Sequence, residues 1–474
     1  MLLEAVALVG LTVVEGVVFG RVLHATVNYD EEVYLASVDA LRHHQVLGSE
    51  VFASQPPGFY GLLVLGAGVA GESVVGLRAV MLAIALAGCL AAYAIGRMLG
   101  GPVAGFLASG LVALPYAAEH KPASITSDFP SLAFGLIALA LVLAAARKRR
   151  PASDAAAVLA GAALAAAVSI KLLAVTVLVP FVAVVIRARD KRLTLGAIAG
   201  AAIVVLAFLA AYGGVLSSLW RDAVAFHLNA ESAPVPGAPS SLRARAAEVF
   251  DALTGRPGAP TVFFVLLVVG AVATLVAWSR RQLLETVPLW LWAVASAFFL
   301  AVQRPLWKHE ILALIVPLAL AAAIAIASLT YGSWRAGPFV AAVSCIAVLV
   351  GLIHAAAQSE AGTDRELEHA VLVVRHRTPP GTTVASDVPL IPFLAGRRQP
   401  GDLVDTSFTR VAAGALDRAR IVRSIERDHA VAVVVGRLFE QDPKLLADLH
   451  RLFPKTIRSG RFTIYVGRAN GAVG

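Results

Sequence analysis

The sequence predicts an α-helical polytopic membrane protein with about eleven transmembrane helices, followed by a small extracytoplasmic α/β domain. Of its 474 residues, 58% are hydrophobic and only 15% are charged, a composition outside the usual range of soluble globular domains. Apolar runs of roughly 17 to 25 residues, long enough to cross about 30 Å of hydrocarbon, recur as far as residue 357. Residues 358–474 are more polar. We therefore predict a membrane domain over 1–357 and a soluble domain over 358–474.

Basic residues are concentrated in short loops between the apolar runs, and such loops are retained in the cytoplasm. They are Arg97, residues 147–150, residues 187–192, Arg280–Arg281 and Arg335. The net charge of +9 is therefore explained by topology, and nucleic acid binding is not predicted. The outer segments are then residues 24–73, 119–128, 215–260, 303–309 and everything after 357. Abundant Ala, Val, Gly and Arg suggest a GC-rich bacterium, so the expected location is the bacterial plasma membrane.

One lysine interrupts an apolar stretch. The stretch Ala155–Ile186 is too long for one crossing, and the basic loops at its two ends must face the same side. It is therefore predicted to form two helices. The break is expected at Ser169–Ile170–Lys171, because an isolated lysine in hydrocarbon costs about 2.5 to 3.5 kcal/mol. This places Lys171 at the outer surface. The shorter piece Gly58–Ala70 is predicted to be a juxtamembrane or re-entrant helix.

Two acidic sites lie in the predicted outer loops. Asp30, Glu31 and Glu32 open the first loop, and Asp128 precedes Phe129-Pro130 at the start of a helix. Each site has a structural explanation, since Asp30 or Asp128 could be the N-cap of the helix that follows. The functional alternative is a general base. Because both acids are expected on the same face, they could converge.

Cations are predicted on that face too: Lys171, Arg304, Lys308 and His309. Such groups suit a lipid phosphate, whose charge must be neutralised close to a low-dielectric phase. The alternative is that they reach to lipid headgroups. Lys171 is the most diagnostic, since a lysine between two apolar half-segments has no interfacial explanation.

Metal and redox chemistry have little support in the sequence. Cys89 and Cys345 each lie inside an apolar run, so both are interpreted as packing residues, and no metal-ligand set is assigned. The C-terminal domain alternates helical stretches, such as Asp364–Arg375 and Leu416–Arg427, with short β-rich runs. These runs include Thr382–Ala385, Ala430–Val435 and Phe462–Val466. It contains no Gly-rich phosphate loop or nucleophile elbow, so its expected role is recognition or cover.

The order of these motifs resembles polytopic glycosyltransferases of the GT-C type, in particular the branch of protein O-mannosyltransferases and aminoarabinose lipid A transferases. The resemblance covers most of the first 330 residues and does not include the C-terminal domain. Glu32 is a departure, because a small residue is common after the acidic pair in this family. The matching places are Asp30–Glu31 with Tyr34–Leu35, Gln55–Tyr60, Ser127–Pro130, Ser169–Lys171, and Trp307–Glu310 with the run to Pro317.

The resemblance implies transfer of a sugar from a polyprenyl-phosphate-sugar donor to a glycan, lipid or protein acceptor in the cell envelope, with inversion at the anomeric carbon. It implies that Asp30 is the catalytic base, with Glu31 as an orienting or backup acid. Asp128 would either support the reacting groups from behind or position the acceptor. The resemblance also implies that the donor phosphate is bound by Lys171, Arg304, Lys308 and His309. The donor is a membrane lipid, so no nucleotide-sugar motif is needed. Some relatives hold a divalent cation at the acids, and the sequence leaves that possibility open.

Two other classes of function remain open. A transporter or flippase of a lipid-linked glycan would place charges along a path at mid-depth, whereas here the charges lie mainly at one interface. A non-catalytic scaffold that displays the C-terminal domain would leave the acids and Lys171 unexplained.

Overall fold

The computed structural model describes residues 2–115, 123–147, 152–230, 241–254, 259–276, 280–303, 306–331, 335–357, 362 and 364–467. The chain forms two compact units, which are described separately. The helical unit comprises Met1–His24, Arg78–Gly213 and Pro239–Glu360. The mixed unit comprises Ala25–Leu77, Gly214–Ala238 and Ala361–Gly474, so it joins the C-terminal segment to residues of two predicted outer loops.

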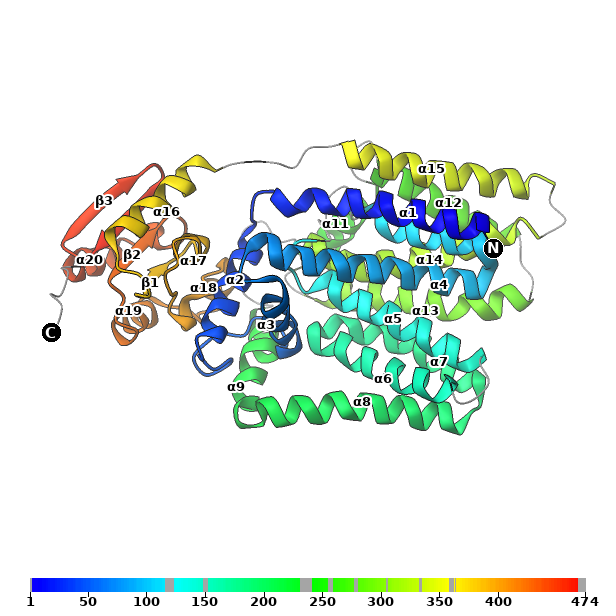
Figure 1. Ribbon diagram of the computed structural model, residues 1–474, viewed down its shortest axis with the longest axis horizontal. Helices are drawn as coiled ribbons and strands as arrows, with labels where there is room; N and C mark the ends of the chain where they lie inside the picture. Colours follow the sequence, from blue (N-terminus) through cyan, green and yellow to red (C-terminus); the bar gives the residue numbers. More distant parts are fainter. Residues whose placement is uncertain are drawn as a thin grey trace. The chain divides into compact units, whose positions relative to one another are not determined.

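The helical unit consists of long apolar helices that run side by side (Figure 1). Its elements are α1 (Leu2–Gly20), η1 (Arg21–His24), α4 (Val74–Pro115), α5 (Asp128–Arg147), α6 (Ala152–Ile170), η3 (Leu172–Val177), α7 (Leu178–Ala188), α8 (Lys191–Tyr212), α11 (Leu242–Thr254), α12 (Ala259–Val276), α13 (Arg280–Val302), η6 (Lys308–Ile311), α14 (Leu312–Ser328) and α15 (Gly337–Ala357). The span Lys308–Ser328, made of η6 and α14, is the most enclosed of the candidate membrane helices, with 89% of its most apolar 18-residue stretch buried. Its neighbours therefore surround it.

The predicted fold class is confirmed: the chain is a polytopic helical membrane protein with a small sheet near its C-terminus. Among the described residues, seven helices are long and apolar enough to cross a membrane. They are Leu2–His24, Val74–Pro115, Asp128–Arg147, Ser153–Ile170, Lys191–Leu228, Lys308–Ser328 and Gly337–Ala357. Shorter apolar helices cover Pro57–Ala70, Leu172–Ala188, Pro260–Leu275 and Thr286–Val302. The predicted total of about eleven crossings stays a prediction.

Helix α4 consists of two stretches that meet at Gly101. The backbone there has a φ of 84°, which is left-handed and which side chains with a Cβ rarely adopt. The stretches on either side pack closely against each other at Gly96. A Cβ added to Gly96 would lie only 2.4 Å from the carbonyl oxygen of Ala104, so no larger residue fits there without a shift. The predicted basic loop at Arg97 therefore lies just before the junction of the two stretches.

The predicted break at Lys171 is confirmed. Helix α6 ends at Ile170, and η3 followed by α7 continues the apolar stretch. Lys171 itself has an extended backbone, with φ −150° and ψ 129°. The lysine side chain is thereby kept at the junction between two helices rather than in the middle of one span.

The mixed unit contains a four-stranded sheet with strand order β1-β2-β4-β3. Strands β1 and β2 are parallel, and β4 pairs antiparallel with both β2 and β3. The strands are β1 (Val384–Ser386), β2 (Ala432–Val435), β3 (Lys455–Ser459) and β4 (Phe462–Val466). The helical elements are α2 (Tyr29–Arg42), α3 (Pro57–Ala70), α9 (Leu216–Trp220), η5 (Arg221–Ala225), α10 (Phe226–Ala230), α16 (Arg365–Arg377), α17 (Leu390–Leu394), η7 (Gly401–Leu403), α18 (Phe408–Ala412), α19 (Arg418–Arg427), η8 (Phe439–Gln441) and α20 (Pro443–Leu452).

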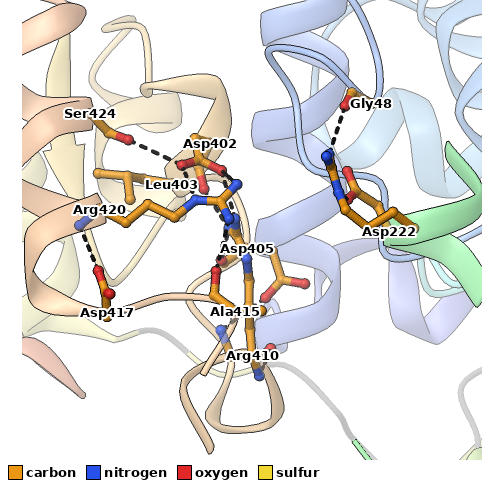
Figure 2. Close-up of polar contacts among 12 residues, drawn as sticks. Gly48, Asp222, Asp402, Leu403, Asp405, Arg410, Ala415, Asp417, Arg420 and Ser424 are labelled. Carbon is orange, nitrogen blue, oxygen red and sulfur yellow. Dashed lines mark hydrogen bonds and ion pairs between the residues drawn. The ribbon is translucent and has the colours of Figure 1, made fainter. Parts of the chain in front are cut away.

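A buried ionic network holds η7 against α18 and α19 in the mixed unit (Figure 2). Asp402 Oδ1 lies 2.6 Å from Arg410 Nη2, and its Oδ2 lies 2.7 Å from Arg420 Nε. Ser424 Oγ donates to the same carboxylate at 3.2 Å. Burial alone would raise the pKa of Asp402, but the hydrogen bonds and charges of the two arginines outweigh it and lower that pKa to about 2.

We expect Asp402→Asn to destabilise the mixed unit by about 3 to 5 kcal/mol, because it leaves the buried Arg410 without its counter-ion. Thermal unfolding of the protein in lipid discs measures this. The carboxylate stabilises the fold fully above its ordinary pKa of 3.8, and this contribution is lost as the pH falls through about 2. The gap in Tm between wild type and variant should therefore close in strong acid.

Asp428→Asn is the matched control, because Asp428 pairs with Arg427, whose side chain is 55% exposed. Such a surface pair contributes about 0 to 1 kcal/mol. Equal Tm losses for the two variants would show that burial of Asp402 has no special effect on stability.

Candidate functional site

A buried polar cluster lies at one end of the helical unit, where three helical segments begin or end. Lys171 Nζ is 2.5 Å from Asp128 Oδ1 and 3.7 Å from Glu310 Oε1. The lysine side chain is 11% exposed, and each carboxylate is 6% exposed. Removing charges from water is costly unless they are paired, so this lysine is held by two acids that compensate its charge. We call Asp128, Lys171 and Glu310 the buried triad.

The helix order brings the buried triad together. Asp128 is the first residue of α5, and the following α6 packs against α5 and ends directly before Lys171. The two residues therefore lie at the same end of a helical hairpin. Glu310 belongs to η6, the single turn that leads into α14, and α14 packs against α5. Three distant parts of the chain thus supply one residue each.

Glu310 is fixed by its own loop. Its Oε2 accepts a hydrogen bond from the backbone N–H of Trp307 at 2.9 Å, and its Oε1 accepts one from the side-chain amide of Gln303. Carboxylates that accept backbone hydrogen bonds at the start of a helical turn are well oriented. Glu310 was part of the motif noted in the sequence but was assigned no role there.

The two cations of the same loop are more accessible than Lys171. The Lys308 side chain is 65% exposed, and its Nζ lies 3.5 Å from Glu248 Oε1 of α11. The His309 ring is 34% exposed, with Nε2 3.9 Å from Asp128 Oδ2. The fourth predicted cation, Arg304, lies outside the described residues. The structure therefore brings Lys171 and His309 to the same carboxylate, while Lys308 faces α11.

Arg245 is a buried cation that sequence reasoning missed. It lies on α11, which packs against η6, three residues before the Glu248 that faces Lys308. Only 4% of Arg245 is exposed, and its Nε and Nη1 have no hydrogen-bond partner among the described residues. An unsatisfied buried donor costs about 1 to 3 kcal/mol, more for a charged group. In the sequence, Arg245 looks like one more surface arginine on a polar helix.

Comparison with known proteins confirms the fold. Residues 54–212 match the dolichyl-phosphate-mannose-protein mannosyltransferase family. ArnT from Cupriavidus metallidurans bound to undecaprenyl phosphate is similar, with a TM-score of 0.68, 16% identity and 98% of each chain covered. The oligosaccharyltransferase of Archaeoglobus fulgidus, in a complex with Zn and sulfate, has a TM-score of 0.54 at 14% identity, covering 94% of this chain and 69% of that one. No curated protein gives a significant match.

The chain has a GT-C fold. The resemblance to the protein O-mannosyltransferase and ArnT branch, expected from short motifs, is confirmed by the family match over residues 54–212, and the structural match extends the likeness in fold over 98% of the chain. The C-terminal segment, which the motifs did not cover, is included in the structural match.

The acids of the first predicted outer loop lie on α2 of the mixed unit. The expectation that Asp30 could be the N-cap of this helix is wrong, because Asn28 is the cap. Asn28 Oδ1 accepts from the backbone N–H of Glu31 at 3.0 Å, and Glu31 Oε2 accepts from that of Asn28 at 3.1 Å. This reciprocal capping box leaves Asp30 without that structural explanation. Asp30 and Asp128 belong to different units, so their convergence stays a prediction.

Metal ligation gains no support from the described ranges, in which no group of three or more His, Cys, Asp or Glu is placed to hold an ion.

Proposed function

We propose that this protein is a membrane glycosyltransferase that moves a sugar from a polyprenyl-phosphate-sugar donor to an acceptor in the bacterial cell envelope. The observation that carries the proposal is Arg245, a buried arginine on a helix that packs against η6, the turn of Lys308 and His309. Two of its nitrogen atoms have no hydrogen-bond partner in the described part of the chain. An anion would accept hydrogen bonds from the N–H groups of this guanidinium and would balance its charge. The donor phosphate is the anion that a GT-C fold of this kind suggests.

Phosphate recognition at this end of the helical unit follows from the charges. A guanidinium presents several N–H groups in a planar fork that fits phosphate oxygens. His309 carries a positive charge only when protonated, and it is exposed enough to meet a ligand. Lys308 is more exposed still and can approach the same headgroup. Support also comes from ArnT, a structure of the same fold, which is bound to undecaprenyl phosphate.

The buried triad suggests a division of roles. In the reaction, an oxygen of the acceptor attacks the anomeric carbon while the bond from that carbon to the phosphate oxygen breaks. The phosphate leaves with the electron pair, and the configuration at carbon inverts. Lys171 would stabilise the charge that grows on the leaving oxygen. Asp128 and Glu310, which contact Lys171, would then act as positioning residues for it.

The proton of the acceptor needs a base, and we propose Asp30 for that role, with Glu31 orienting the start of the helix. The capping box holds α2 through Asn28 and Glu31, so Asp30 can change its protonation state without loss of the cap. General base catalysis contributes about 10² to 10⁴ in rate.

Binding of undecaprenyl phosphate to the protein in lipid discs tests the site. We expect Arg245→Met to weaken binding about tenfold or more, because charge-assisted hydrogen bonds contribute about 1.5 to 3 kcal/mol. Arg243→Met is the matched control, because Arg243 is an exposed arginine two residues away on the same helix. Equal affinities for wild type and Arg245→Met, with the control also unchanged, would remove Arg245 from the donor site.

A further inference from the structure

A second set of unsatisfied polar atoms lies in the mixed unit, at the carboxyl ends of the parallel strands β1 and β2. Asp387 directly follows β1, and Arg437 lies two residues after β2. Ligands of open α/β sheets bind beyond the carboxyl ends of parallel strands, where successive loops diverge. The first turn of α2 lies against these loops, because the Tyr29 ring stacks on Arg437.

The loop after β2 is held rigidly. Asp387 Oδ1 accepts a hydrogen bond from the backbone N–H of Gly436 at 2.9 Å. Its Oδ2 accepts from the backbone N–H groups of Arg437 at 2.9 Å and Phe439 at 2.8 Å. One carboxylate thus holds three backbone N–H groups within the four-residue segment 436–439. Such loops are ordered before any ligand arrives, which lowers the entropic cost of binding.

The Arg437 guanidinium is positioned by aromatic rings. Its Cζ lies 3.6 Å from the centre of the Tyr29 ring and 5.7 Å from that of Phe408. Tyr29 is fixed in turn, since its hydroxyl accepts from the backbone N–H of Thr406 at 2.7 Å. Stacking leaves the edge of a guanidinium free to donate hydrogen bonds.

Two atoms here lack partners. Arg437 Nη1 and Glu32 Oε2 are both buried without a hydrogen-bond partner among the described residues. Glu32 lies three residues after Tyr29 on the same face of α2, and the Tyr29 ring is the one on which Arg437 stacks. Burial raises the pKa of Glu32 to about 8, and Arg437 offsets part of that rise. Buried polar groups in native proteins are nearly always paired, so an unpaired donor and an unpaired acceptor on neighbouring elements can both take hydrogen bonds from a ligand.

We propose that Arg437 and Glu32 form an acceptor subsite that binds the hydroxyl groups of a neutral glycan. A hydroxyl both donates and accepts, so it satisfies the guanidinium and the carboxyl together. A fully ionised anionic group would satisfy Arg437, but it would offer no proton to the unpaired oxygen of Glu32, whereas a hydroxyl does. This inference rests on the proposed glycosyltransferase function and specifies its acceptor.

The test measures binding of neutral methyl disaccharides, and of their phosphorylated counterparts, to the full chain in lipid discs loaded with undecaprenyl phosphate. We expect the neutral sugars to bind wild type more tightly than the phosphorylated ones. Arg437→Gln and Glu32→Leu should each weaken neutral-sugar binding about tenfold, because each removes one partner of a buried hydroxyl. Both should leave the affinity for undecaprenyl phosphate unchanged.

Arg458→Met on the exposed strand β3 is the control, and it should change neither affinity. Unchanged sugar affinity in both folded variants would overturn the subsite, since the two atoms would then be satisfied by trapped water. Tighter binding of the phosphorylated sugars would overturn it too. Failure of wild type to bind undecaprenyl phosphate would instead count against the proposed function itself.

Discussion

Replacing Asp30 by Asn is expected to lower the rate of sugar transfer by about 10² to 10⁴, because the amide cannot take the proton of the acceptor. The substitution keeps the shape of the side chain, and the helix cap depends on Asn28 and Glu31 instead. The variant should therefore fold and bind undecaprenyl phosphate normally. Turnover with saturating donor, measured beside donor affinity, separates a lost base from a lost fold.

Asp39→Asn provides the matched control, because Asp39 lies on the same helix nine residues further on. It should transfer sugar at close to the wild-type rate. If Asp30→Asn transferred as fast as Asp39→Asn, the base would have to be sought at Glu31 or Asp128.

Lys171→Met is expected to have the second large effect. It leaves the carboxylates of Asp128 and Glu310 buried beside each other without their shared cation. Breaking a buried ion pair from one side costs about 3 to 5 kcal/mol, so the single variant should unfold at a clearly lower temperature. Thermal unfolding in lipid discs measures the loss.

The double variant Lys171→Met with Asp128→Asn separates the two roles of the lysine. It removes one charge of each sign, so most of the lost stability should return. Transfer should not return, because no lysine remains to stabilise the leaving phosphate. Recovery of wild-type turnover in the double variant would show that Lys171 is needed only for folding.

The sequence predicted those features whose physical cause is local. Hydrocarbon excludes charge, so the position of Lys171 in an apolar stretch was enough to locate the end of α6. The buried strands β2 and β4 were found for a similar reason, since their residues are apolar and β-branched. Strand β3 was missed, because it is an exposed strand at the edge of the sheet, with Lys455 and Arg458 in a polar pattern.

Features that depend on distant contacts could not be predicted in this way. Asp30 looked like a possible helix cap until the structure showed Asn28 in that position. Arg245 and Arg437 resemble other surface arginines in the sequence. They are distinguished only by buried side-chain nitrogens for which the described residues provide no hydrogen-bond partner. The grouping of residues 25–77 with the C-terminal segment also depends on contacts that no local pattern records.

The most direct test of the central claim is release of polyprenyl phosphate. The purified protein in lipid discs would be supplied with a panel of polyprenyl-phosphate sugars and envelope acceptors, and the released lipid phosphate would be measured for wild type and Arg245→Met. We predict acceptor-dependent release by wild type with one or more donors, and a much lower rate for the variant at subsaturating donor. No release by folded wild-type protein, with donors and acceptors shown to be competent in a control reaction, would contradict the account and favour transport of a lipid-linked glycan.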